Sequence, residues 1–220
     1  MAPATDLSES EITRLLSSPR FARYLAAAGS FEDAVILYEW NVRISSAFFE
    51  SMHYFEISLR NIMHDALLVH GDQLDSSGTP WYRHPGIALE PRTRTVVAAA
   101  VWRATRGGVS ENAGKVVAEL GLGFWSKLLS DTYNRTLWEP CLGKTFPNAR
   151  RRRLHSSVED IARLRNRIAH HEPIHQRPLA SDFSALLGAS KVISPGLETW
   201  IEETSRVRIL LMDRPQRSVS

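Results

Sequence analysis

The residues of this chain with the clearest chemical potential gather in one stretch toward the C-terminus. Residues 141–180 include nine basic and three acidic side chains, a balance of +6, whereas the whole 220-residue chain has a net charge of only +3. Four of the eight histidines, His155, His170, His171 and His175, lie in the same stretch. Guanidinium groups bind phosphate-like oxygens, and imidazole exchanges a proton near neutral pH. The stretch therefore indicates a site that faces a polyanion, with a solvated helix face as the alternative.

Within this stretch, an arginine, a polar residue and a histidine stand at a distinctive spacing. Arg165 is followed directly by Asn166 and, four residues after Asn166, by His170, inside the phrase LRNRIAHHEPI. This phrase resembles the C-terminal motif of the Abi-like proteins, which belong to the HEPN superfamily of helical ribonucleases. The segment YFEISLRN at 54–61 is similar to the family's E-x-x-L-R-N segment, and LGFWSKL at 122–128 is similar to its G-[FT]-W-x-K-L segment. The three segments occur in the family's order, and the resemblance covers residues 30–190.

The resemblance implies a metal-independent RNA endonuclease that acts as an abortive-infection effector against phage. His170 would transfer a proton at the ribose or the leaving oxygen, Arg165 would stabilise charge on the phosphoryl oxygens, and Asn166 would hold the phosphate or His170. The resemblance also implies a homodimer. Residues expected to support the site are Glu56, Arg60 and His171. Two other functions stay open: a non-catalytic RNA-binding helical module, and a toxin restrained by an inhibitory RNA or an antitoxin protein.

Helix geometry adds two expectations that do not depend on the family. At 100° per residue, Arg165 lies within an apolar stripe formed by Leu154, Val158, Ile161 and Ile168. Glu56 also lies within an apolar stripe, so we predict that Glu56 and Arg165 form an ion pair that fixes helix packing, orients a catalytic arginine, or does both. His170 points about 140° away from Arg165, so a single helix does not bring the two side chains together; two facing helices in a two-fold dimer could, and the homodimer that the resemblance implies is consistent with this geometry.

Further arginines are candidates for binding RNA phosphates. They are Arg150, Arg151, Arg152, Arg153 and Arg167. A run of four wraps around a helix, so only one or two of its members can face one ligand, and a solvated helix is the alternative. The cluster His171, Glu172 and His175 lacks a zinc-binding spacing because Pro173 interrupts the helix. We therefore expect no metal and no cofactor.

The elements that must position these residues are predicted to be helices throughout. Ser8 and Glu11 form a capping-box pattern, a long helix is predicted over 31–70, and 71–90 reads as a loop insertion. Further helices are expected from Pro91 to before Gly107, from Ser110 to near Gly121, and over 124–138, 148–171, 182–193 and 196–212.

These helices predict an all-α fold in one domain over 1–220, with an N-terminal extension at 1–29 and a frayed tail at 213–220, and the resemblance implies a HEPN-like helical bundle. The chain has a single cysteine, no apolar run long enough to span a membrane and no signal-peptide pattern. These features favour a cytoplasmic protein without a membrane anchor.

Overall fold

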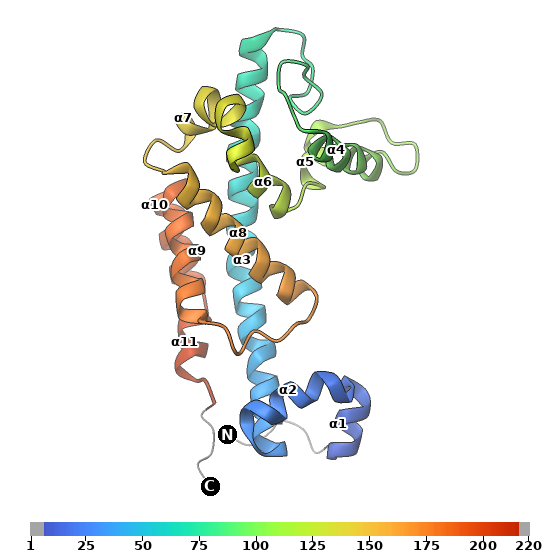
Figure 1. Cartoon of the computed structure of the whole chain (residues 1–220), viewed down its shortest axis with the longest axis vertical. Coiled ribbons are helices and arrows are strands. Elements are labelled where there is room, and N and C mark those ends of the chain that lie inside the picture. The colour runs from blue at the N-terminus through green and yellow to red at the C-terminus, as the bar shows by residue number, and fades with distance from the viewer. Residues whose placement is uncertain (1–6, 216–220) are drawn as a thin grey trace. The chain divides into compact units, whose positions relative to one another are not determined.

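The computed structural model describes residues 7–215, and each regular element within them is a helix. The all-α class predicted from the sequence is therefore confirmed. The elements, labelled in Figure 1 where there is room, are α1 (Glu9–Leu16), α2 (Ser18–Ala28), α3 (Phe31–Leu74), α4 (Pro91–Ala104), α5 (Ala113–Ala118), α6 (Leu122–Leu128), the 3₁₀ helix η1 (Asp131–Tyr133), the π-helix η2 (Asn134–Leu142), α7 (Gly143–Thr145), α8 (Arg151–Ala169), α9 (Leu179–Ile193), α10 (Pro195–Thr204) and α11 (Val207–Met212).

The described chain divides into two compact units. Unit 1 contains residues 7–51, 164–183 and 204–215, and unit 2 contains residues 52–163 and 184–203. Helices α3, α8 and α9 each supply residues to both units. The sequence predicts one domain, whereas the contacts within the chain group its residues into these two units.

The long helix α3 owes its length to an uninterrupted pattern of large apolar residues. Its buried side chains recur every three or four residues, the spacing that puts them on one face. They include Leu37, Trp40, Ile44, Phe48, Met52, Phe55, Leu59, Met63 and Leu67. At 1.5 Å per residue the helix is roughly 66 Å long. It continues through Gly71, where the sequence analysis expected it to end, and stops at Leu74.

Unit 1 is built on the first half of α3. The capping box predicted at Ser8 and Glu11 opens α1, and α1 packs against α2. The indole nitrogen of Trp40 donates to the carbonyl of Leu210 at 2.7 Å, which ties α11 to α3. The Arg214 guanidinium donates to the carbonyl of His175 and lies over the Trp40 ring. Fraying of the tail stays a prediction, and its residues 216–220 lie outside the described part of the chain.

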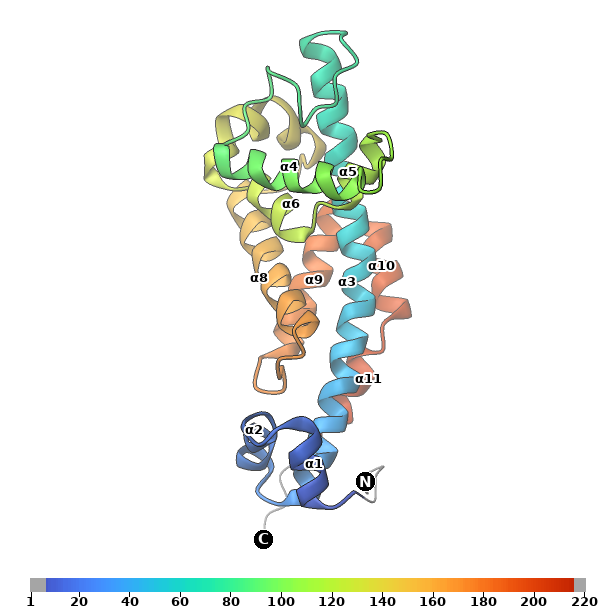
Figure 2. The same cartoon turned by 90° about the vertical axis from the view of Figure 1, so that its right-hand side faces the viewer.

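Unit 2 surrounds the second half of α3. Residues 75–90 form no helix, as the sequence predicted. This segment folds back onto α3, where the indole nitrogen of the buried Trp81 donates to Nδ1 of His64 at 2.9 Å. Helix α4 runs crosswise to α3 and packs against α5 (Figure 2). The helix predicted over 124–138 is instead α6, η1 and the π-helix η2. Pro140 lies inside η2, where its missing N–H is incompatible with a regular α-helical ladder.

Candidate functional site

The chain leaves α8 through a tight left-handed cap directly after the segment Arg165–His170. His171 has φ +56°, its N–H donates to the Ile168 carbonyl at 2.9 Å, and the Glu172 N–H donates to the Arg167 carbonyl at 2.8 Å. This pair of bonds is a Schellman motif, in which glycine usually occupies the left-handed position. A histidine there is an uncommon choice and adds strain. The cap fixes where the chain leaves the helix, directly after His170.

The three residues predicted to be catalytic all lie in unit 1, where Arg165 and Asn166 belong to the last turns of α8 and His170 directly follows its last residue, Ala169. Asn166 and His170 are exposed and lie four residues apart, so they stand on the same side of the helix. Arg165 is half-buried, and its guanidinium carbon lies 5.9 Å from the centre of the Phe49 ring on α3. The ring face attracts the cation and helps to hold the arginine. Asn166 and His170 therefore share an open face, and Arg165 points toward α3.

A buried amide ties the chain after α8 to α3. The side-chain oxygen of Asn41, which is 6% exposed, accepts the backbone N–H groups of Ile174 at 2.9 Å and His175 at 3.0 Å. Sequence reasoning missed Asn41. The pattern that singled out Glu56 could also have found Asn41, because Asn41 is a polar residue among the apolar positions Leu37, Ile44 and Phe48.

His175 itself is buried against the Tyr24 ring, with ring centres 4.8 Å apart. Neither ring nitrogen of His175 has a hydrogen-bond partner among the described residues. Burial, followed by the charge of Arg214, lowers the pKa of His175, so its imidazole stays neutral near neutral pH. His175 is a packing residue of unit 1, consistent with its position beyond the Schellman cap.

The N-terminal helix α2, which lies outside the family resemblance, contacts the end of α8. The Arg20 guanidinium donates to the carbonyl of His171 at 2.9 Å. Beside this contact is a pocket of about 700 Å³ lined by α2, the first half of α3 and the end of α8. Its lining includes Arg20, Tyr24, Tyr38, Asn41, Phe49 and His171. The pocket lies next to the predicted catalytic residues and was not visible in the sequence.

Glu56 connects two of the three family-like segments within unit 2. Its side-chain oxygen accepts the backbone N–H of Leu122 at 3.1 Å, at the first residue of α6. A carboxylate at this place satisfies an unpaired N–H and faces the positive end of the helix dipole. Glu56 therefore caps α6, and its pairing with Arg165 stays a prediction. The neighbouring Arg60 is half-buried, and its Nε donates to the Asn61 side chain.

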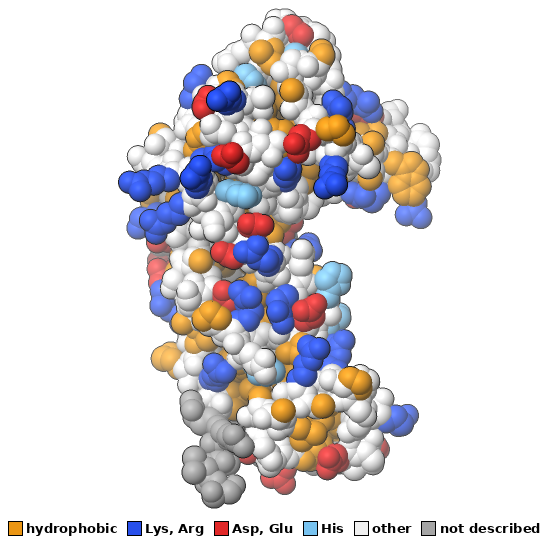
Figure 3. Space-filling model, viewed as in Figure 1, with side chains coloured by type: hydrophobic (Ala, Val, Ile, Leu, Met, Phe, Trp, Pro, Cys, Tyr) orange, Lys and Arg blue, Asp and Glu red, His pale blue; other side chains and the backbone are white. Residues whose placement is uncertain are grey.

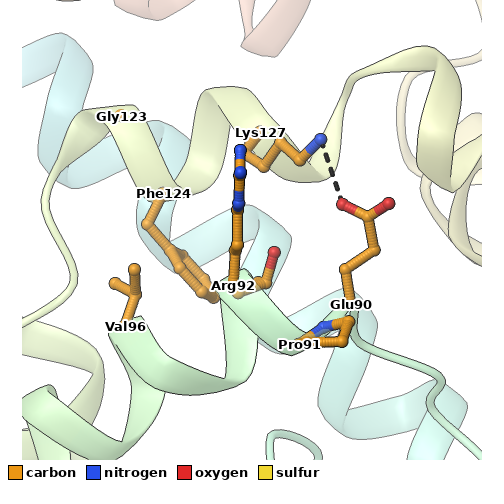
Figure 4. A pocket seen from close by; sticks show the side chains of 8 residues that line it. Glu90, Pro91, Arg92, Val96, Gly123, Phe124 and Lys127 are labelled. Atoms are coloured by element: carbon orange, nitrogen blue, oxygen red, sulfur yellow. Dashed lines mark ion pairs between the residues drawn. The ribbon is translucent and has the colours of Figure 1, made fainter.

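The segment at 122–128 lines a second pocket of about 710 Å³, shown in Figure 4. Lys127 pairs with Glu90 at 3.2 Å, and its ammonium group lies 5.9 Å from the centre of the Tyr133 ring. In Figure 4 the Arg92 side chain rises beside Lys127 at the start of α4, and Phe124 lies near Val96. The ion pair between Lys127 and Glu90 thus links α6 to the start of α4, so this segment has a structural role.

The predicted phosphate-binding arginines have different surroundings. Arg151 is 8% exposed and donates to the Asn134 side chain, the Leu129 carbonyl and Asp131. Each nitrogen of the Arg151 guanidinium is thus used inside unit 2, and its binding of RNA phosphate stays a prediction.

The other four arginines predicted to bind phosphate are exposed or half-buried. Arg150, Arg152 and Arg153 are exposed, and Lys and Arg side chains gather on the face drawn in Figure 3 where α8 begins in Figure 1. Arg167 is half-buried; it lies 3.4 Å from a Glu172 oxygen and donates to the Pro173 carbonyl, so it braces the turn after α8. RNA binding by these four arginines stays a prediction.

Neither a metal cluster nor a membrane span is found in the described part of the chain. Among residues 7–215, no three His, Cys, Asp or Glu side chains are grouped as metal ligands would be. No helix within those residues has the length and apolar character needed to cross a bilayer. The chain matches no protein-family model, no curated protein and no solved structure.

Proposed function

We propose that the protein is a metal-independent RNA endonuclease with a HEPN-like helical bundle, acting as an abortive-infection effector. The observation that carries the proposal is the placement of Asn166 and His170 together on the open face of the last turn of α8. The exposed imidazole of His170 has one ring nitrogen that can accept a proton and another that can donate one, which is the capacity that acid–base catalysis requires.

The proposed reaction uses the ribose 2′-hydroxyl as the nucleophile. His170 removes the hydroxyl proton, or protonates the departing 5′-oxygen, while the 2′-oxygen forms a bond to phosphorus and the bond to the 5′-oxygen breaks. Arg165 stabilises the charge that builds on the phosphoryl oxygens, and Asn166 donates a hydrogen bond to the phosphate. The products are a 2′,3′-cyclic phosphate and a 5′-hydroxyl. DNA lacks the 2′-hydroxyl and is not a substrate.

The proposed active form is a homodimer with a composite site. Arg165 and His170 lie about 140° apart around one helix, so one copy of α8 does not aim both side chains at one phosphate. Two copies related by a two-fold axis bring both residues from each chain to one cleft. Sedimentation or light scattering gives the mass of the active species. A strictly monomeric protein that still cuts RNA would refute the composite site.

The test of the activity is a gel assay with end-labelled RNA in EDTA, beside DNA of the same sequence. Wild-type protein is expected to cut the RNA and leave the DNA intact. His170→Ala should lower cutting by about 100-fold or more while RNA binding persists, because acid–base catalysis contributes roughly that factor. His53→Ala changes an exposed histidine on α3 and serves as the matched control.

Three results would contradict the proposal. Loss of cutting in EDTA with recovery on adding a divalent metal would indicate metal-dependent chemistry. Equal cutting by wild type and His170→Ala would show that His170 is not the catalytic acid or base. RNA binding without any cutting by the wild type would favour the non-catalytic RNA-binding module.

A further inference from the structure

The pocket beside the end of α8 has aromatic walls suited to a flat ligand. Tyr24 and Tyr38 pack edge to face with ring centres 5.1 Å apart, and Phe49 is 45% exposed. The pocket volume of about 700 Å³ lies within the usual range of small-molecule sites. Aromatic rings presented in a cavity of this size stack on the faces of planar rings, and unpaired nucleobases are the common biological example.

Polar groups in the same pocket suit the edge of a base. The amide oxygen of Asn41 is occupied by two backbone N–H groups, and its amide nitrogen donates no hydrogen bond to any residue of the described chain. Burial, and then the neighbouring Tyr38, raise the pKa of Tyr24 to about 12, so its hydroxyl stays protonated and able to donate. The Glu172 side chain, 48% exposed, supplies an acceptor at the rim. Donors and acceptors around an aromatic slot are what a base edge requires.

The pocket lies next to both groups assigned to the chemistry. Phe49, one of its walls, lies under the Arg165 guanidinium, and His171, another wall, is the neighbour of His170 in the chain. The Arg20 guanidinium, which holds the His171 carbonyl, places a cation at the same wall, where it favours a phosphate-bearing ligand. A nucleotide whose phosphate reaches Arg165 or His170 of this chain therefore has a base-sized pocket beside it.

We infer that this pocket binds an unpaired base of the RNA substrate, next to the phosphate that is cut. The inference rests on the proposed function, which identifies the bound strand as RNA. It assigns the contacts with the base to α2 and the first half of α3. Phe49 and Tyr38 stack on the base, and Asn41 contacts its edge. The N-terminal helix α2 is then part of the substrate site.

Binding of an uncleavable RNA tests the pocket without requiring cleavage. The probes are a 12-nucleotide 2′-O-methyl RNA that contains all four bases and the same strand with every base replaced by an abasic sugar, measured by fluorescence anisotropy. Wild-type protein is expected to bind the base-bearing strand roughly tenfold more tightly, because one stacked base contributes about that factor. Ser46→Trp, which fills the rim of the pocket from α3, should remove this difference.

Matched variants separate the pocket from general effects. Ser181→Trp makes the same change at an exposed position of α9 outside the pocket lining and should keep the tenfold preference. Tyr38→Leu removes a stacking face without filling the pocket and should also reduce the preference, so a failure of Ser46→Trp to fold does not prevent the test. Circular dichroism checks folding of each variant.

The outcomes distinguish this inference from the proposed function. Equal binding of the two strands by wild type, or an unchanged preference in folded Ser46→Trp and Tyr38→Leu, overturns the base pocket even if RNA is cut. A preference that is lost in both variants supports the pocket even if no cutting occurs. Tight binding of free AMP, GMP, CMP or UMP without binding of the RNA strand would assign the pocket to a mononucleotide and overturn its assignment to RNA.

Discussion

Replacing Asn41 by leucine should loosen the segment that follows the motif helix. The Asn41 oxygen accepts two buried backbone N–H bonds, from Ile174 and His175, 133 and 134 residues away in the chain. Leucine has a similar shape but offers no acceptor, so both N–H groups lose their partner. Each buried donor left without a partner costs about 1–3 kcal/mol, and the added apolar contact offsets part of this. We expect a net loss of about 2–4 kcal/mol.

Hydrogen exchange measures this loss where it occurs. A loss of about 2 kcal/mol should speed exchange of the Ile174 and His175 amides by roughly 30-fold. If the whole chain unfolds together, the melting temperature should fall by roughly 4–16 °C, taking about 2–4 °C per kcal/mol. Asn41→Asp keeps the accepting oxygens and should preserve the protection of both amides.

The matched control is Asn61→Leu, which changes an exposed asparagine on the same helix. Among residues 7–215 the Asn61 side chain accepts only from Arg60 Nε, so the melting temperature should change little. Unchanged exchange at Ile174 and His175 in Asn41→Leu would refute the anchoring role. So would a loss of stability no larger than that of Asn61→Leu.

Three other predictions follow from the described contacts. Arg151→Met should lower stability by about 1–3 kcal/mol because the buried Leu129 carbonyl loses its donor, while Asp131, whose side chain is 82% exposed, stays solvated; Arg152→Met, at an exposed position, should have little effect in the same denaturant titration. Because burial lowers the pKa of His175 in the folded state, unfolding takes up a proton, and stability should fall as the pH drops below about 6.5; His175→Phe should flatten that decline in urea titrations, and an identical decline would contradict it. If Glu56 and Arg165 pair, Glu56→Gln combined with Arg165→Met should cost clearly less than the sum of the single changes, while additive losses would show that they do not meet.

Local patterns in the sequence were sufficient to predict most of the helices. Capping residues, apolar spacing and the helix start at Pro91 act over a few residues, so they predicted the beginnings of α1, α3 and α4 closely. The same reasoning put Arg165, Asn166 and His170 on one helix near its end, because the angular position of a side chain depends only on its place in the helix. It failed over 124–142, where packing in unit 2 favours a π-helix around Pro140.

The surroundings of the polar residues depended on tertiary structure. Arg151 looked like its exposed neighbours in sequence, yet its partners Leu129, Asp131 and Asn134 come from the turns before α8 and remove it from solvent. Arg20 meets the His171 carbonyl across 151 residues of chain, and Asn41 holds a loop 133 residues away. A helix pattern is a local property, whereas the partner of a charge or an amide is decided by which distant segments pack beside it. The pocket at the end of α8 exists only because α2 and α3 pack there.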